Sequence, residues 1–423
     1  MDFSKKKRAT VITAVMIGNI LEWYEIYLFV YWAPIISKLF FPPNDGTGAL
    51  TNTFLVFALG FLSRPFGGIF FGRLGDRIGR KKALILSVLM MTVPTFVMGL
   101  LPTYHSIGGA AVWILLFMRL CQSFPAGGEL PGGFCYLYES SPLNSRRFLC
   151  SWATVAYQLG ILISTVECYL LEKFLSPESL ISWGWRLSFF VGGLFGLFGL
   201  LLRYKLHETP LFQEMILHEK VVRDPILQVL YRYKGKILLG TLFCVLNSSA
   251  FYLLSVHLPI YFVQLFNTNY SNTLIYTIFF LLFITIPIPF FGYLGDKWNN
   301  KALLIGSTLA MIFLLYPLHY GIQTASPWIT MSSILAYGIF FTCLSALIPY
   351  IVAELSPTYV RFTCTAISFN LADSVIGGFT PVGALLLINY THNSSSFIWI
   401  LLFSSLLSLI GYLLMKPRAA NQY

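Results

Sequence analysis

The sequence predicts an all-α membrane protein whose twelve transmembrane helices form two pseudo-symmetric six-helix bundles. Composition is the first observation, because 57% of the 423 residues are hydrophobic and only 11% are charged, whereas a soluble domain is about 25% charged. The second observation is a series of apolar runs, each close to the ~20 residues that a helix needs to cross a bilayer. The third is a motif that recurs half a chain later and indicates a duplication.

The apolar runs fall into two sets, and a polar segment rich in His, Glu and Arg separates them. We therefore expect an N-terminal half at 1–204, a cytoplasmic linker at 205–235 and a C-terminal half at 236–423. The predicted spans are 10–36, 51–72, 82–101, 109–137, 148–172, 186–204, 236–263, 272–293, 301–320, 327–352, 361–388 and 396–415.

The distribution of positive charge predicts the orientation. If the N-terminus is inside, 23 of the 28 Lys and Arg residues fall in cytoplasmic segments and three in outer segments, while Arg64 and Arg119 lie within spans. Cytoplasmic loops of membrane proteins carry an excess of Lys and Arg. Both termini are therefore expected to be cytoplasmic.

A basic turn after the second span is the motif that recurs. It reads GRLGDRIGRKK around Asp76, and a degenerate copy, GYLGDKWNNK, places Asp296 220 positions later. A second pair supports the repeat, because Glu139 and Arg146 in ESSPLNSRR recur 215 positions later in ELSPTYVR. Two halves with the same topology predict a parallel repeat about an axis along the membrane normal.

Several classes of function lack a supporting pattern. The seven cysteines lie in or beside apolar runs without CxxC spacing, so neither disulfides nor a metal site is expected. No Ser-His-Asp spacing or nucleotide-binding loop appears, so neither an enzyme nor a cofactor is expected. The net charge of +11 is confined to short loops, which argues against nucleic acid. The first apolar run is longer than a signal-peptide core and lacks an A-x-A site, so we interpret it as a retained span.

Charged residues within the spans are candidate functional residues, since each costs about 2.5–3.5 kcal/mol to insert. At ~1.5 Å per residue, Arg119 lies roughly 15 Å and Glu22 roughly 16 Å below the outer face. Glu25 follows Glu22 by three residues on the same helix face, so we expect Arg119 opposite one or both carboxylates. One of the two acids is then left to carry a coupled proton, and Asn19 and Gln122 lie one turn away. A purely structural ion pair is the alternative.

Asp373 is a further candidate near the midplane. It lies about 12 residues, or roughly 18 Å, from the inner end of its span, and Asn370 precedes it by three residues. A carboxylate at this depth binds an ammonium group or is a protonated, hydrogen-bonded core acid, and both interpretations stay open. Trp23 and Tyr24 are expected to face a cavity, where a quaternary ammonium stacks on them by cation–π attraction.

A second group of charges is predicted near the cytoplasmic ends of the spans, where it forms a charged latch that closes the inner side. Glu167 and His257, in contrast, lie toward the outer ends, where solvated side chains are expected. The latch residues are Arg64, Asp76, Arg77, Arg80, Glu129, Glu139 and Arg146, with Asp296, Glu354 and Arg361 from the second half.

Several of these motifs resemble those of a known protein family. GRLGDRIGRKK is similar to the loop signature of the major facilitator superfamily. The segments GNILEWYEIY (18–27), RPFGG (64–68), RLCQSFPAGGE (119–129), GWR (184–186), ELSPTYVR (354–361) and GGFTPV (377–382) together resemble its metabolite:proton symporter branch. That branch includes proline/betaine, α-ketoglutarate, citrate and shikimate transporters. The resemblance implies alternating access with proton-driven uptake across a bacterial inner membrane.

Three departures from the branch are visible. Glu25 stands where its first-span motif usually has Asp, Asp373 stands where it is usually uncharged, and the chain ends at MKPRAANQY without the coiled coil of osmosensing members. Three midplane acids against Arg119 favour a zwitterion such as proline, betaine or an amino acid. The alternatives are an organic acid clamped by Arg119 and a non-transporting receptor on the same scaffold. The expected partners are a small molecule, a proton and the bilayer, for a chain acting as a monomer.

Overall fold

The computed structural model describes residues 5–42, 47–222, 224–257, 270–324 and 326–415, and it confirms the predicted helical membrane fold. Eleven described helices are long and apolar enough to cross a membrane, and α20, of 17 residues, is the twelfth segment. At ~1.5 Å per residue, α20 is about 26 Å long, close to the ~30 Å of a bilayer core.

The N-terminal set comprises α1 (Lys5–Tyr31), α3 (Thr47–Ile78), α4 (Arg80–Met98), α6 (Ala110–Ser140), α7 (Arg146–Phe174) and α9 (Trp185–Tyr204). The C-terminal set comprises α12 (Lys234–Tyr252) with η4 (Leu253–His257), α14 (Tyr270–Thr285) with α15 (Ile288–Lys297), α16 (Asn300–Gln323), α17 (Pro327–Glu354), α18 (Arg361–Asn370) continued by η6 (Leu371–Gly377) and α19 (Gly378–Thr391), and α20 (Ile398–Leu414). Short helices connect them: α2 (Ala33–Phe40), α5 (Tyr104–Ile107), η2 (Leu143–Ser145), α8 (Pro177–Ser179), η3 (Leu180–Gly184), α10 (Pro210–Leu217), α11 (Pro225–Arg232) and η5 (Thr358–Val360).

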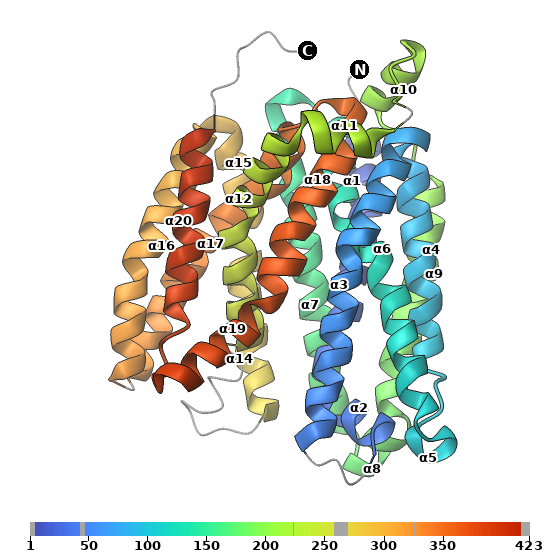
Figure 1. Ribbon diagram of the computed structural model, residues 1–423, viewed down its shortest axis with the longest axis vertical. Coiled ribbons are helices and arrows are strands. Elements are labelled where there is room, and N and C mark those ends of the chain that lie inside the picture. Colours follow the sequence, from blue (N-terminus) through green and yellow to red (C-terminus); the bar gives the residue numbers. More distant parts are fainter. Residues whose placement is uncertain (1–4, 43–46, 223, 258–269, 325, 416–423) are drawn as a thin grey trace.

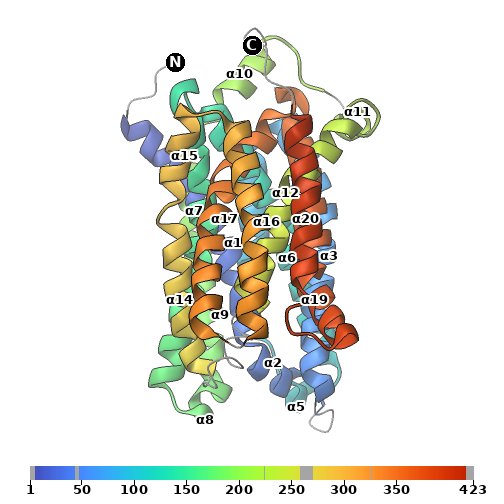
Figure 2. The same cartoon turned by 90° about the vertical axis from the view of Figure 1, so that its left-hand side faces the viewer.

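The two sets lie side by side (Figure 1). Helices α3, α4, α6 and α9 form one side of the molecule and α16, α17 and α20 the other, with α1, α7 and α18 near the boundary. Helix α1 begins and α20 ends at the end of the bundle that carries α10 and α11 (Figure 2). We call residues 5–204 the N-terminal half and residues 234–414 the C-terminal half.

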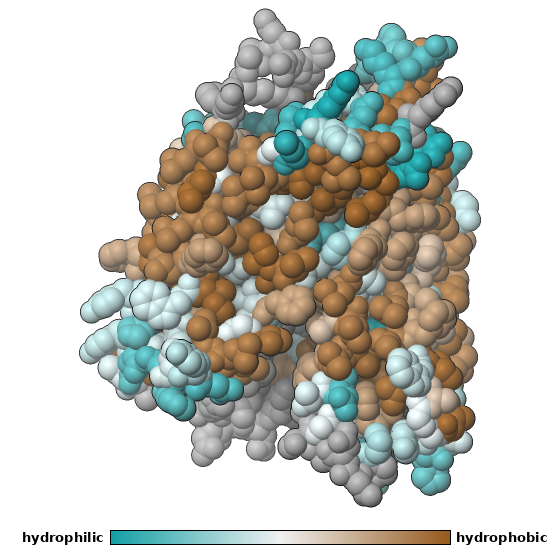
Figure 3. Space-filling model, viewed as in Figure 1, coloured by the Kyte–Doolittle hydropathy of each residue, from teal (hydrophilic) through white to brown (hydrophobic). Residues whose placement is uncertain are grey.

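The outer surface matches a lipid environment. Apolar side chains form a band around the middle of the visible face, and polar side chains gather at both ends (Figure 3). Large apolar residues that face outward include Phe66, Trp113 and Phe313. Because lipid tails are as apolar as these side chains, the exposed band indicates the part of the surface that faces the bilayer.

Glycines bring α3 and α6 into backbone contact. A Cβ atom added to Gly67 would lie 1.6 Å from the carbonyl oxygen of Phe124, and one added to Gly127 would lie 1.9 Å from that of Arg64. Close approach of this kind is typical of helix pairs in membranes, where small residues replace the hydrophobic effect as the basis of packing. The contact fixes Arg64 against α6.

The eleventh span is interrupted in its middle. Between α18 and α19 the backbone forms a π-helical segment, η6, which carries Asp373. π-helical turns inside α-helices occur frequently at functional sites. The π-helical segment ends at Gly377, and α19 begins at Gly378. A Cβ on Gly377 would lie 2.8 Å from the Tyr252 ring.

The α3–α6 contact leads to a first prediction. Gly127→Ala should lower the midpoint of thermal unfolding by a few degrees, because its Cβ overlaps the α3 backbone and overpacking costs about 1–3 kcal/mol. Gly306→Ala is the matched control, since nothing lies within 4 Å of its Cβ and Ala favours a helix by about 1 kcal/mol over Gly. Unfolding of the purified protein, followed by tryptophan fluorescence, measures both. Equal midpoints would contradict the close packing.

Candidate functional site

A buried arginine joins the two halves near the membrane midplane. Arg64, on α3, donates through Nη2 to Glu22 Oε1 at 2.7 Å and through Nη1 to Asp373 Oδ2 at 3.2 Å. Glu22 lies on α1 of the same half, whereas Asp373 lies on η6 of the other half. All three side chains are buried, and we call them the midplane triad. The sequence placed Arg64 in the cytoplasmic latch, and the structure places it here instead.

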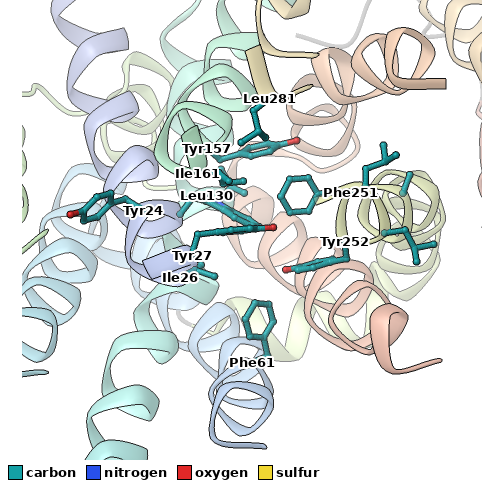
Figure 4. Packing of buried hydrophobic residues seen from close by; sticks show 14 of the residues in the cluster. Tyr24, Ile26, Tyr27, Phe61, Leu130, Tyr157, Ile161, Phe251, Tyr252 and Leu281 are labelled. Atoms are coloured by element: carbon teal, nitrogen blue, oxygen red, sulfur yellow. The ribbon is translucent and has the colours of Figure 1, made fainter. Parts of the chain in front are cut away.

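Aromatic rings surround the triad. The Arg64 guanidinium lies 4.6 Å from the centroid of Phe61 and 5.5 Å from that of Trp23. Trp23 in turn packs against Phe251 of the C-terminal half at 5.1 Å, and Tyr252 donates to Asp373 Oδ2 at 3.3 Å. Figure 4 shows Phe61 of α3 lying close to Phe251 and Tyr252 of α12. Stacking of this kind stabilises a buried cation.

A second polar cluster lies within the N-terminal half. Arg119 donates to Gln122 Oε1 at 2.9 Å, and Gln122 Nε2 donates to Thr95 at 2.7 Å and to Glu25 Oε2 at 3.3 Å. The expected direct pairing of Arg119 with Glu22 or Glu25 does not occur among the described ion pairs. Arg119 Nε and Nη2 have no hydrogen-bond partner within the described chain. The cluster therefore holds a guanidinium with unused donors beside a carboxyl group.

Of the other residues expected near the substrate, two lie at helix contacts. Asn19 is buried against Gly133 of α6, and its amide has no partner among the described residues. Asn370 donates to the carbonyl oxygens of Gly127 at 2.6 Å and Ala366 at 2.7 Å. Asn370 therefore ties the start of η6 to the opposite half.

Tyr24 was expected to face a cavity, and the structure places it elsewhere. Its hydroxyl donates to Glu167 and to the carbonyl oxygen of Ser188, and its ring points away from Tyr27 and Phe251 (Figure 4). Glu167, expected to be solvated, is instead mostly buried against this hydroxyl. A helix buried on every side gives no sequence signal for which residue faces which neighbour. His257 ends η4, and its side chain lies outside the described part.

Glu129 also departs from its predicted place in the latch. It forms a buried ion pair with Arg203 of α9 and accepts from Ser87 of α4 at 2.5 Å, entirely within the N-terminal half. The sequence analysis counted Arg203 among the cytoplasmic basic residues, at the inner end of the sixth predicted span, and gave it no partner. Its partner could be found only by knowing that α6 and α9 both pack against α4.

The cytoplasmic latch is built on a helix N-terminus. Asp76, at the end of α3, accepts from the backbone nitrogens of Phe362 at 3.2 Å and Thr363 at 2.9 Å, and from Thr363 Oγ1 at 2.7 Å. These nitrogens open α18 of the opposite half. The first turn of a helix has unpaired N–H groups and a partial positive charge, so Asp76 caps α18 across the boundary.

Ion pairs reinforce this cap. Arg80 lies 3.2 Å from Asp76 and 3.0 Å from Glu139, and Glu139 accepts from Arg361 of the other half at 2.7 Å. Arg80 also donates to the carbonyl oxygen of Thr358. All four charged groups are buried, whereas Arg77 is exposed and takes part in none of the described ion pairs.

The repeated motif forms a matching contact. Asp296, at the end of α15, accepts from the backbone nitrogens of Arg147 and Phe148, each at 3.0 Å, and so caps α7 of the N-terminal half. The two caps are related by the offsets that the sequence shows. However, Asn300 stands at the position equivalent to Arg80, so this copy lacks the central arginine. Glu354 accepts from Tyr350, and Arg146 donates to the carbonyl oxygen of Ser141.

Within the described residues, no group of three His, Cys, Asp or Glu side chains is placed to hold a metal ion. The site contains three carboxyl groups and two guanidinium groups, all buried: the midplane triad at the boundary of the two halves, and Glu25 with Arg119 within the N-terminal half. Such an arrangement can bind a charged small molecule and exchange a proton.

The chain is similar to known transporters. The family model described as "Sugar (and other) transporter" matches residues 10–224. The chain is 31% identical over 415 residues to a citrate-proton symporter of Klebsiella pneumoniae, covering 98% of this chain and 93% of the relative. It is 32% identical over 429 residues to a putative proline/betaine transporter of Staphylococcus aureus, covering 98% and 90%.

Solved structures share the fold. The proton:xylose symporter XylE bound to 6-bromo-6-deoxy-D-glucose superimposes with a TM-score of 0.79 at 17% identity, covering 96% of this chain and 95% of that one. A double-tryptophan variant of XylE gives a TM-score of 0.86 at 16% identity, covering 99% and 98%.

The cap on α18 leads to a second prediction. Asp76→Asn should loosen the inner end while the protein still inserts, because a capping charge at a helix N-terminus contributes about 0.5–2 kcal/mol. Two native thiols report on it: Cys364 and Cys135 are buried beside the latch, and the half-buried Cys121 is the internal reference. Maleimide labelling of Cys364 and Cys135, followed by mass spectrometry, should rise severalfold relative to Cys121. Unchanged labelling would show that the cap does not hold this end closed.

Proposed function

Because the chain belongs to the sugar (and other) transporter family of the major facilitator superfamily, we propose that it is a proton-coupled symporter of a small polar metabolite, with a zwitterion as the favoured substrate. The single observation that carries the proposal is the midplane triad, in which one guanidinium is shared by carboxylates from both halves. Alternating access requires a site at the boundary whose contacts change when the halves move.

Charge balance supports a zwitterion. Glu22, Glu25 and Asp373 oppose Arg64 and Arg119, so the site carries one negative charge in excess and becomes neutral when it takes up one proton. A neutral site accepts a net-neutral ligand without leaving a buried charge unpaired. Aromatic rings beside the triad suit a substituted ammonium group, and relatives at 27–32% identity are named proline/betaine transporters.

The alternative substrate is an organic acid. Arg119 supports it, because two of its donor groups have no partner among the described residues, and a relative at 31% identity is named a citrate-proton symporter. A tricarboxylate, however, brings three negative charges to a site with two guanidinium groups and three acids. It would need more protons than a zwitterion.

Electrostatics also supports the coupling. With a proton bound, the site is neutral and holds the substrate; when the proton leaves, the excess negative charge weakens binding of a carboxylate, so both leave together. We favour Glu25 as the proton carrier, since Gln122 separates it from Arg119. Glu22 and Glu25 each have one oxygen without a partner in the described chain. Glu22 is the second candidate, although it is held by Arg64.

The excess of Lys and Arg at the end that carries α10 and α11 supports cytoplasmic termini. The relatives are bacterial proteins, and we propose a place in the bacterial inner membrane. The linker at 205–235 would then lie on the cytoplasmic side, and each half would move as a unit of six spans. One chain supplies every residue of the midplane site, so a monomer suffices.

The third prediction concerns the coupled proton. Replacing the proton carrier by Gln fixes it in the neutral form, so gradient-driven accumulation should be lost while exchange of substrate across the membrane survives. We expect this result for Glu25→Gln. Counterflow and proton-driven uptake in proteoliposomes, measured side by side with Glu22→Gln, separate the two acids. Full accumulation in both variants would contradict the proposal, and loss of both activities would indicate a structural ion pair.

The fourth prediction concerns the substrate. In proteoliposomes with an imposed proton gradient, a panel of amino acids, betaines and carboxylates should show accumulation of a zwitterion and its collapse when an uncoupler removes the gradient. Accumulation of citrate or another organic acid alone would favour the alternative substrate. Saturable binding without accumulation of any compound would indicate a receptor.

A further inference from the structure

We propose that Asp373 is an internal stand-in for the substrate's carboxylate: it occupies Arg64 in the empty site, and an incoming carboxylate displaces it. The displaced Asp373 then pairs with the cationic group of the same ligand. This inference rests on the proposed function and assigns the chemical roles of two residues within it.

The geometry of Arg64 makes one of its two contacts exchangeable. Glu22 and Asp373 each engage a single guanidinium nitrogen, Nη2 and Nη1, and Nε has no hydrogen-bond partner in the described chain. A carboxylate that binds a guanidinium through two parallel hydrogen bonds is held more strongly than one held by a single bond. Glu22 stays with Arg64 when the halves move, because both belong to the N-terminal half, whereas Asp373 approaches from the other half at the longer distance of 3.2 Å.

The backbone around Asp373 permits the displacement. Helix α18 is anchored to the N-terminal half at its first turn by Asp76 and at its last residue by the bond from Asn370 to Gly127. The π-helical segment η6 begins at the next residue and ends at Gly377, and a second glycine, Gly378, opens α19. Asp373 therefore lies on the irregular stretch that follows the last anchor, where glycine adds conformational freedom.

A displaced Asp373 requires a cation. It is buried, and the Tyr252 hydroxyl would remain as its neutral donor. An unpaired carboxylate in a buried site is costly, so a ligand that takes Arg64 away must supply a replacement charge. A zwitterion does so, because its carboxylate binds Arg64 while its ammonium group meets Asp373 beside Phe61 and Phe251. A carboxylate without a cationic group leaves Asp373 unpaired.

The same exchange explains how the empty site can close. Without a ligand, Asp373 supplies the negative charge from the C-terminal half that the substrate supplies when it is present. Both the empty and the zwitterion-loaded sites therefore present the same pairing across the boundary.

The test uses two ligands of the same shape. Glycine betaine and 3,3-dimethylbutanoate differ in that a quaternary nitrogen is replaced by carbon; L-proline and cyclopentanecarboxylate form a second such pair. Equilibrium binding to the purified full-length chain is measured for wild type, Asp373→Asn and Asp373→Glu. Wild type should prefer the zwitterion of a pair by about tenfold or more, since leaving one member of a buried charge pair alone costs more than the ~1.4 kcal/mol of a tenfold change.

In Asp373→Asn the carboxylate isostere should bind about tenfold more tightly than in wild type, because its competitor for Arg64 is gone, and the zwitterion should not. The preference then disappears, whereas Asp373→Glu should retain it. A structural role for Asp373 would change both ligands by one factor and leave their ratio intact, and that result would overturn the proposal. Equal tightening of both ligands would likewise overturn the pairing of Asp373 with the ligand's cation.

Failure of this inference can be told apart from failure of the proposed function. If no carboxylate of either pair binds, Asp373 is not standing in for one, and the inference is wrong even where a proton gradient drives uptake of an uncharged compound. If proton-driven uptake fails for every compound but the isostere ratio shifts in Asp373→Asn as expected, the binding roles hold and the coupling is wrong.

Discussion

A charge inside a membrane is costly unless it is paired, and Arg64 is paired with Glu22 and Asp373 by using both halves of the molecule. The rest of the structure follows from it. Glycines bring α3 against α6 and so fix Arg64 at depth, aromatic rings shield it, and an interruption of the eleventh span presents Asp373. Because the described ion pair of Asp373 is with Arg64 of the other half, the two halves are complementary there rather than merely adjacent.

The inner end uses a different form of pairing. Asp76 lies where α3 meets α4 and Asp296 lies where α15 meets α16, and each caps the first turn of a helix in the other half. The boundary is therefore closed by two caps that the repeat relates. The duplication visible in the sequence thus becomes reciprocal in three dimensions, with each copy of the basic turn binding the opposite half. A carboxylate on backbone N–H groups depends on direction, and a small rotation of one half is enough to break it.

The sequence predicts the features that depend on a pattern of residue types, namely the spans and their orientation. It does not predict how deep a side chain lies along its helix or which neighbouring helix it faces. Runs of about 20 apolar residues define the spans, and the Lys and Arg distribution defines the ends. Arg64 was placed too near the cytoplasm because the apolar run stops at Gly72, whereas the helix continues through its polar end to Ile78. The orientation predicted for Tyr24 was wrong because α1 is buried on all sides from Leu21 to Phe29, where no periodicity distinguishes its faces. Arg203 was missed as the partner of Glu129 because pairing between helices needs their neighbourhood, which a single sequence does not contain.

One substitution between the copies bears on how the molecule would open. Arg80 ties Asp76 and Glu139 together at the α18 cap, while Asn300 stands in its place at the α7 cap. Breaking the contact at the α18 cap leaves several buried charged groups without partners. Breaking the contact at the α7 cap separates only Asp296 from Arg147, whose side chain is already partly exposed to water. We therefore expect the contact between α15 and α7 to break before the contact between α3 and α18. The halves would then rotate about the contact that remains, between α3 and α18, instead of separating evenly on both sides. The two copies of the motif would thus have different roles in opening: one contact is released and the other serves as the hinge.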